Sequence, residues 1–263
     1  MLSPRIIPVL LVHEKGLVKT VKFKDPKYVG DPINAVKIFN EKEADELIVI
    51  DIDASIKGVE PDYKLIEKLA TECRMPLCYG GGIKTVEQAQ RILGLGVEKV
   101  ALSSVVFKKP ELITELAEHV GRQSVVVILD VKKRFLGAKY DCYSLNAKVN
   151  QKVCAFELAQ KVEALGAGEI VINSIDNDGV MKGYDIDLIT KIKSLVSVPV
   201  TAVGGAGSYD DIKTLLRNHP IIGAAAGSAF VFKGKYKAVL INYPTVVEKL
   251  NILSVTSDIM KKD

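Results

Sequence analysis

The sequence predicts a closed (β/α)8 barrel, because short apolar runs and helical stretches alternate along its 263 residues. The runs are rich in Val, Ile, Leu and Ala without strict alternation, which is typical of parallel strands covered on both faces. They occupy residues 5–12, 47–52, 76–79, 98–103, 124–130, 169–174, 199–203 and 221–226. The helical stretches occupy residues 31–44, 61–73, 84–94, 109–120, 152–165, 184–195, 208–217 and 237–251. The alternative, a doubly wound sheet, seldom has so many parallel strands in regular alternation.

An internal repeat supports the barrel, because the first half of the chain matches the second at a nearly constant offset. At an offset of 123 residues, Glu46 aligns with Glu169 and the glycine pair 81–82 aligns with the pair 204–205. Several matches at one offset are hard to obtain by chance. The repeat therefore predicts an α/β barrel that arose by duplication of a half-barrel.

The repeat also predicts the domain organisation. We expect one barrel domain over residues 1–263, built from half-barrels at about 1–122 and 123–263. Two segments, 13–30 after the first strand and 131–151 after the fifth, fit neither half, and we expect them to be loops.

Composition argues against several classes of protein. Lysine and arginine number 36 against 32 acidic residues, and the net charge of +4 is too small to indicate a nucleic-acid partner. No apolar run approaches the ~20 residues that cross a bilayer, so we expect a cytoplasmic protein without a membrane partner. The four cysteines and three histidines show no metal or redox spacing, so we expect no metal and no cofactor.

Small-residue turns follow four of the predicted strands, at the end of a barrel where active sites form. Small residues let backbone N–H groups approach a phosphate, and the next helix start adds about half a positive charge. The repeat relates these turns in pairs, so we expect two phosphate pockets and a small-molecule ligand with a phosphate at each end. The alternative is that the glycines only satisfy tight turns. The residues are Gly81, Gly82, Ser103, Ser104, Gly204, Gly205, Gly227 and Ser228.

Carboxylates also gather at strand ends. Asp51 and Asp53 follow the second strand, Asp130 ends the fifth, and Asp176 and Asp178 follow the sixth. Burial would raise the pKa of such a group and neighbouring cations or N–H groups would lower it, and either change suits acid–base chemistry. We expect Asp130 and Asp51 to be catalytic and Asp178 to bind substrate. The alternative is that Asp51 and Asp130 only hold loops through backbone hydrogen bonds.

Four charged residues stand at strand starts, at the opposite end of the barrel: Arg5, Glu46, Lys99 and Glu169. A lone charge pointing into the barrel is costly, whereas two opposed pairs can satisfy one another. One hypothesis is a salt-bridged plug that closes the barrel. The other is a gate to a passage through it.

In these features the chain resembles the cyclase subunit of imidazole glycerol phosphate synthase. The resemblance covers roughly residues 5–235. It rests on the stretches RIIPVL, GDPINAV, ADELIVIDIDAS, PLCYGGGIKTVEQAQRIL, GVEKVALSS, KPELITELAEHVG, ALGAGEIVINSIDNDG, GYDIDLI and VPVTAVGGAGS.

The resemblance implies a division of labour between the two ends of the barrel. A glutaminase subunit would dock on the amino-terminal face, and ammonia would pass the four charges and travel through the barrel. At the other end it would attack a bisphosphate, giving imidazole glycerol phosphate and an aminoimidazole carboxamide nucleotide. Lys19 would belong to a flexible first loop, and the glycine turns would bind the two phosphates.

One departure from the family bears on the chemistry. The family's two catalytic aspartates end the first and fifth strands, and this chain has Asp130 but carries Leu11 at the other position. An isobutyl group cannot take or give a proton, and losing a general acid–base group costs about 10²–10⁴-fold in rate. Ser103, Asp53 and Val203 also differ from the residues usual in the family. We therefore expect altered chemistry above a retained ammonia gate.

The combination of a retained ammonia gate with altered chemistry above it resembles a paralogous branch of the same family. This branch is associated with amidation of bacterial surface-polysaccharide sugars. There a glutaminase and a barrel partner supply ammonia to a separate sugar amidotransferase. The first hypothesis is therefore an ammonia-conducting barrel of this kind. The second is an ordinary cyclase of histidine biosynthesis in which Asp130, Asp51 or Asp53 compensates for Leu11. The third is a non-catalytic scaffold for a glutaminase.

Overall fold

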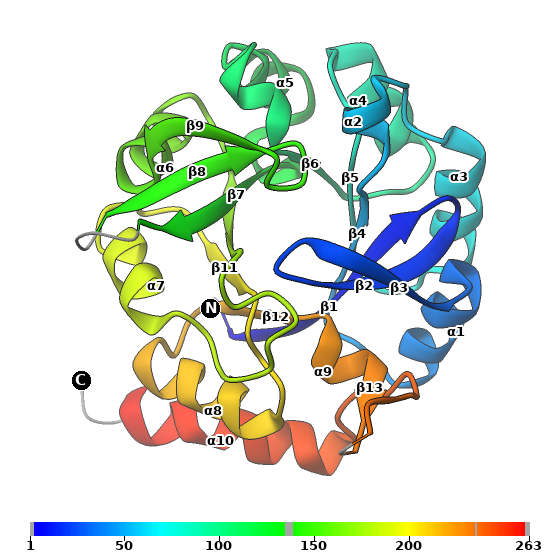
Figure 1. Ribbon diagram of the computed structural model, residues 1–263, viewed down its shortest axis with the longest axis vertical. Coiled ribbons are helices and arrows are strands. Elements are labelled where there is room, and N and C mark those ends of the chain that lie inside the picture. The colour runs from blue at the N-terminus through cyan, green and yellow to red at the C-terminus, as the bar shows by residue number, and fades with distance from the viewer. Residues whose placement is uncertain (1–2, 135–138, 235, 261–263) are drawn as a thin grey trace.

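The computed structural model describes residues 3–134, 139–234 and 236–260, and it contains a closed barrel of parallel strands (Figure 1). Each barrel strand pairs in parallel with both of its neighbours, and the pairing of Arg5 with Gly223 joins the last strand to the first. The predicted (β/α)8 barrel is therefore confirmed. Its strands are β1 (Arg5–His13), β4 (Leu47–Asp51), β5 (Leu77–Gly80), β6 (Lys99–Leu102), β7 (Val125–Lys133), β10 (Glu169–Ser174), β11 (Val200–Val203) and β12 (Gly223–Ala226).

Helices surround the barrel, and side-chain caps begin many of them. The cap residues Asp31, Asp62, Thr85, Asp185 and Ser208 each accept a hydrogen bond from the backbone N–H three residues further on. The main helices are α1 (Pro32–Glu41), α3 (Tyr63–Glu72), α4 (Val86–Gly94), α5 (Leu112–Val120), α6 (Ala155–Ala164), α7 (Ile186–Lys193), α8 (Tyr209–Asn218) and α10 (Val246–Met260). Single turns are α2 (Ala54–Lys57), η1 (Ser104–Phe107), η2 (Arg122–Ser124) and α9 (Ser228–Val231).

Two segments that were expected to be loops contain β-hairpins instead. The first consists of β2 (Gly16–Val21) and β3 (Lys24–Gly30), and the second of β8 (Tyr140–Ser144) and β9 (Val149–Cys154). The strands β1 and β7 extend beyond the barrel, and the following segments fold back to pair with them in antiparallel fashion. This pairing provides hydrogen bonds for backbone N–H and C=O groups that would otherwise lack partners at the carboxyl end of the barrel, which we call the mouth. Residues 135–138 of the second segment lie outside the described residues.

The last predicted helix, 237–251, was placed too early. The chain first forms the short hairpin of β13 (Phe232–Lys233) and β14 (Ala238–Val239), and α10 begins only at Val246. Pro244 cannot lie inside a helix, and Thr245 and Glu248 cap the start of α10 reciprocally: the Thr245 N–H donates to the Glu248 carboxylate at 2.8 Å, and the Glu248 N–H donates to the Thr245 hydroxyl. This capping pair is visible in the sequence and was the missed signal.

A close contact at the start of β12 yields a stability prediction. A methyl group on Gly223 would overlap the hydroxyl of the buried Thr201 on the neighbouring strand. We expect Gly223→Ala to lower the free energy of unfolding by about 1–3 kcal/mol, the usual cost of overpacking, as measured by urea denaturation. The control is Gly94→Ala at the end of α4, where nothing lies within 4 Å and alanine favours the helix. Equal stability of Gly223→Ala and the parent would contradict the packing argument.

Candidate functional site

Side chains that point into the barrel form layers, because alternate residues of each strand face inward. On the adjacent strands β6, β7 and β10, each inner series ends in a polar residue at the carboxyl end of the barrel. From the amino end upward the three series are Lys99, Ala101, Ser103; Val126, Ile128, Asp130; and Glu169, Val171, Asn173.

The lowest layer is a closed network of four charges, which brings together all four residues predicted there. Arg5 pairs with Glu46 and with Glu169, the latter at 2.7 Å, and Lys99 lies 2.8 Å from Glu46 and 2.9 Å from Glu169. Thr201 adds a hydrogen bond to Glu169 at 2.6 Å. Each cation therefore contacts both anions, and the network closes the amino end of the barrel.

Electrostatics keeps this network charged although it is largely buried. Burial disfavours the charged forms of Arg5 and Lys99, yet the two glutamates hold the pKa of both groups above the ordinary value. For Glu169, burial is likewise outweighed by Arg5 and Lys99, and its pKa lies below the ordinary value. Opposite charges in contact thus compensate the loss of hydration.

Above the charges the barrel interior is apolar. The lining is Ile7, Val9, Ile48, Cys78, Ala101, Val126, Ile128, Val171 and Ala225. Burial raises the pKa of the Cys78 thiol well above its usual range, so this side chain stays neutral. Between the charged layer and the mouth, the lining therefore consists of small and aliphatic side chains.

At the mouth, Asp130 is held by the polar residues of its own layer. The Ser103 hydroxyl donates to its carboxylate at 3.2 Å and the Asn173 amide donates at 3.0 Å. Burial raises the pKa of Asp130 to about 7, although both hydrogen bonds favour the charged form. The carboxyl can therefore take or give a proton near neutral pH, as an acid–base group requires.

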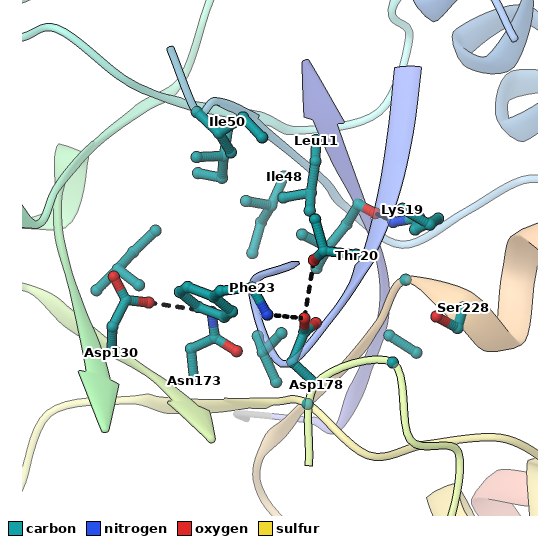
Figure 2. Close-up of a pocket in the computed structure, with 18 of the residues that line it drawn as sticks. Leu11, Lys19, Thr20, Phe23, Ile48, Ile50, Asp130, Asn173, Asp178 and Ser228 are labelled. Carbon is teal, nitrogen blue, oxygen red and sulfur yellow. Dashed lines mark hydrogen bonds between the residues drawn. The ribbon is translucent and has the colours of Figure 1, made fainter. Parts of the chain in front are cut away.

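Two strands on the opposite side of the mouth contribute apolar residues to it. Leu11 on β1 and Ile50 on β4 pack on the interior cluster and line the same pocket as Asp130, and Val203 does so beside Asn173. Figure 2 shows Leu11 and Ile50 across the pocket from Asp130 and Asn173. Leu11 therefore contributes no acid–base group to the mouth.

The predicted phosphate-binding residues divide between two adjoining pockets. The first pocket contains Lys19, Asp178, Gly204, Gly205, Gly227 and Ser228. The second contains Gly81, Gly82, Ser103 and Ser104, together with Asp51, which was predicted to be catalytic. Both share Asp130 and Ser103, so the Asp130 carboxyl lies where the pockets meet. Their role in phosphate binding stays a prediction.

Two of these glycines are required by close approaches. A methyl group on Gly81 would lie 2.8 Å from the Asp51 Cβ, and its φ of +123° disfavours other residues. A methyl group on Gly227 would overlap the Lys19 ammonium group. The glycines therefore also satisfy steric needs of the turns, which was the alternative interpretation.

Lys19 is buried beside Gly227 and donates a hydrogen bond to the Val9 carbonyl oxygen. Burial lowers its pKa to about 8, while the nearby Asp178 carboxylate opposes this change. Strand β2 carries Lys19 across the mouth, so the residue comes from a hairpin and not from a barrel strand.

Asp178 holds that hairpin in place. Its carboxylate accepts hydrogen bonds from the Thr20 hydroxyl at 2.8 Å and from the Phe23 N–H at 3.2 Å, and its carbonyl oxygen accepts from the Lys22 N–H (Figure 2). Burial raises the pKa of Asp178 despite these bonds. Phe23 and Thr20 line the first pocket and were missed by the sequence analysis, because their segment was expected to be a loop.

The second hairpin is held over the other pocket. The Leu145 N–H at its tip donates to the Ser104 hydroxyl at 3.0 Å, and the Asn146 amide donates to the Ile52 carbonyl oxygen at 2.9 Å. Asn146 lines both pockets. It too was missed, whereas Asn173 could have been found from the inward alternation of Glu169 and Val171 along β10.

Two of the three remaining acidic candidates, Asp51 and Asp53, have structural partners. Asp51 accepts from the backbone N–H groups of Asp53 and Ala54, at 2.8 and 3.1 Å, and so supports the turn after β4. Asp53 contacts His13 at 2.6 Å and Lys57 at 2.9 Å. Asp53 is outside the residues that line the two pockets, which does not favour it as a substitute for a carboxylate at position 11. A catalytic role of Asp51 stays a prediction.

Neither a metal site nor a membrane-spanning helix is found in the described residues. Over residues 3–134, 139–234 and 236–256, no cluster of three or more His, Cys, Asp or Glu side chains is arranged for a metal ion. In the same part of the chain, every helix is too short or too polar to span a membrane.

The fold and the site define a class: a (β/α)8 barrel whose candidate site lies at the carboxyl ends of the strands, where barrel enzymes carry their active sites. The profile of the family described as "Histidine biosynthesis protein" matches residues 5–237. The chain belongs to this family and, within it, to the HisF-type cyclase subunits.

Individual relatives agree with this assignment. A Vibrio vulnificus protein named "Putative imidazole glycerol phosphate synthase subunit hisF3" is 68% identical over 96% of this chain and 97% of its own length. A Pseudomonas aeruginosa protein named "Putative imidazole glycerol phosphate synthase subunit hisF2" is 53% identical over 96% and 100%. The "Imidazole glycerol phosphate synthase subunit HisF" of Pseudoalteromonas translucida is 40% identical over 88% and 91%.

The environment of Asp130 yields a testable titration. We expect its carboxyl to titrate near pH 7 in a carbon-detected NMR experiment, with Asp130→Asn identifying the signal. Asn173→Val removes a donor to the charged form, so the pKa should rise further. Because burial raises the folded-state pKa, the parent should lose stability relative to Asp130→Asn as the pH rises from about 4 to about 7. A pKa near 4 in the parent would contradict this account.

Proposed function

We propose that this chain conducts ammonia from a glutaminase docked at its amino-terminal face to a phosphorylated acceptor at its mouth. We place it in the branch that supports amidation of surface-polysaccharide sugars, with a separate sugar amidotransferase as the final partner. The observation that carries this proposal is Leu11, which stands opposite Asp130 in the mouth while the four-charge network below is complete.

The apolar interior of the barrel favours the passage of a neutral molecule over that of an ion. Moving an ion into an apolar passage costs far more than moving a neutral molecule. Ammonia fits the aliphatic lining between the charged layer and the mouth, whereas ammonium does not. The network of Arg5, Glu46, Lys99 and Glu169 must open for passage, which supports its role as a gate.

The mouth supports a one-carboxylate reaction. When ammonia adds to a carbonyl carbon, the N–C bond forms as the C=O π electrons move to oxygen. Nitrogen is then left with a surplus proton, which the charged form of Asp130, with a pKa of about 7, can accept. A cyclisation whose second acid–base group stands at position 11 would lack it, because Leu11 is apolar and so is Ile50 beside it on β4. Transfer of nitrogen is therefore favoured over ring closure.

An exposed apolar surface supports docking at the amino-terminal face. Lys249 pairs with Asp45 just before β4, and Tyr243 donates to the Ile6 carbonyl oxygen, so the start of α10 lies at this end of the barrel. The first turns of α10 expose apolar side chains at this same end. These are Val246, Val247 and Leu250, with exposed fractions of 61%, 77% and 64%. Such a patch is typical of a protein interface.

A second candidate function is the ordinary cyclase of histidine biosynthesis. Both pockets are present, and Lys19, Asp130 and Asp178 all line the first of them. A bisphosphate could therefore still bind across the mouth. A measurement of cyclase activity then distinguishes the ordinary cyclase from the ammonia-conducting barrel.

The first functional prediction concerns Leu11. Supplied with ammonia and the bisphosphate substrate of the ordinary cyclase, the purified chain should show negligible ring closure, measured by the release of imidazole glycerol phosphate. Leu11→Asp restores a second carboxyl, and we expect at least a hundredfold increase, the lower range of a general acid–base effect. The control is Leu240→Asp, because Leu240 is half exposed and lies outside both pockets. Parent turnover like that of an ordinary cyclase would favour the second function.

The other prediction concerns docking. Mixed with a glutaminase subunit from its own genome, the chain should form a complex in sizing chromatography, and glutamine hydrolysis should rise. Leu250→Glu places a charge in the apolar patch and should weaken the complex at least tenfold. Val149→Glu is the matched control, because Val149 is 40% exposed but lies on β9 at the opposite end of the barrel. Absence of any complex with the parent chain would remove the ammonia-transfer proposal.

A further inference from the structure

The tip of the second hairpin reaches the boundary between the two pockets. Strand β7 continues beyond the barrel, and β8 and β9 carry the tip across the mouth to the turns after β4 and β6 (Figure 1). Six residues line both pockets: Ile50, Ile52, Ser103, Ile128, Asp130 and Asn146. Asn146 is the member of this set that does not come from a barrel strand or the turn directly after one.

Among these six residues, Asn146 also offers a side-chain oxygen, Oδ1, that could accept a hydrogen bond from a ligand. The isoleucines offer apolar side chains, and Ser103 is bonded to Asp130. The Asn146 side-chain nitrogen donates to the Ile52 carbonyl oxygen, while among the described residues no donor reaches its Oδ1. A ligand that spans the two pockets would therefore meet a carbonyl acceptor at this point, next to the Asp130 carboxyl.

The backbone at the tip is held in an unfavourable conformation. Leu145, Asn146 and Ala147 have φ angles of 53°, 53° and 59°. Asparagine tolerates this left-handed region, whereas leucine and alanine rarely adopt it and cost about 1–2 kcal/mol each. The Leu145–Ser104 bond and the Asn146–Ile52 bond hold the tip there. Strained residues held in this manner are common at binding sites.

We propose that Asn146 determines specificity by binding the central, hydroxyl-bearing part of a ligand that carries a phosphate at each end. The Oδ1 atom accepts a hydrogen bond from the ligand while the side-chain nitrogen keeps its bond to Ile52. This inference rests on the two phosphate pockets of the proposed function. It adds a residue that recognises neither phosphate but the segment that joins them.

The experiment compares a probe that lacks this central segment with one that contains it. Inorganic phosphate tests a single pocket, and fructose 1,6-bisphosphate or ribulose 1,5-bisphosphate, whichever the parent binds more tightly, tests the span. Asn146→Gly removes the amide and tolerates the left-handed backbone, so the hairpin should still fold. By calorimetry we expect it to bind the bisphosphate about tenfold more weakly, as for a lost hydrogen bond, and to bind inorganic phosphate as the parent does.

Leu145→Gly is the matched control. It also introduces glycine at a positive φ one residue away, but it keeps the Asn146 amide, so bisphosphate affinity should stay within twofold of the parent. If Asn146→Gly binds the bisphosphate like the parent, the inference about Asn146 is overturned and the pockets stand. If the parent binds neither probe, both the phosphate pockets and this inference fail.

Discussion

The charged network at the amino end of the barrel is the interaction on which the site above it depends. Arg5, Glu46, Lys99 and Glu169 pair only when all of them point inward, and each therefore fixes the facing of its strand. A slip by one residue would turn every inner side chain of that strand outward. Because alternate residues share a face, the same constraint that buries the charges also directs the residues of the mouth toward one another.

Two features at the mouth act on one carboxyl group. Ser103 and Asn173 donate hydrogen bonds to the Asp130 carboxylate and favour its charged form, while burial favours the neutral form and raises its pKa to about 7. Burial therefore outweighs the two hydrogen bonds, and the protonation of Asp130 is set by the packing of the mouth as well as by its polar partners.

Patterns that repeat along the chain were predictable, and contacts between distant segments were not. The barrel strands and the charged network follow from apolar runs and from charges at strand starts, which are local signals. The hairpins were missed because strand pairing at the mouth depends on the length of β1 and β7 beyond the barrel. Asn146 could not be found, since nothing near it in the sequence indicates that it reaches Ile52. The caps at Thr245 and Glu248 were visible and overlooked.

The two hairpins also tie the halves of the barrel to each other. The hairpin of the first half is held by Asp178 in the second, and the hairpin of the second half is held by Ile52 and Ser104 in the first. Each half therefore contributes one hairpin to the mouth, and residues of the other half hold that hairpin in place. A fragment that ended near residue 122 would keep the first hairpin but lose Asp178, the residue that holds this hairpin in place.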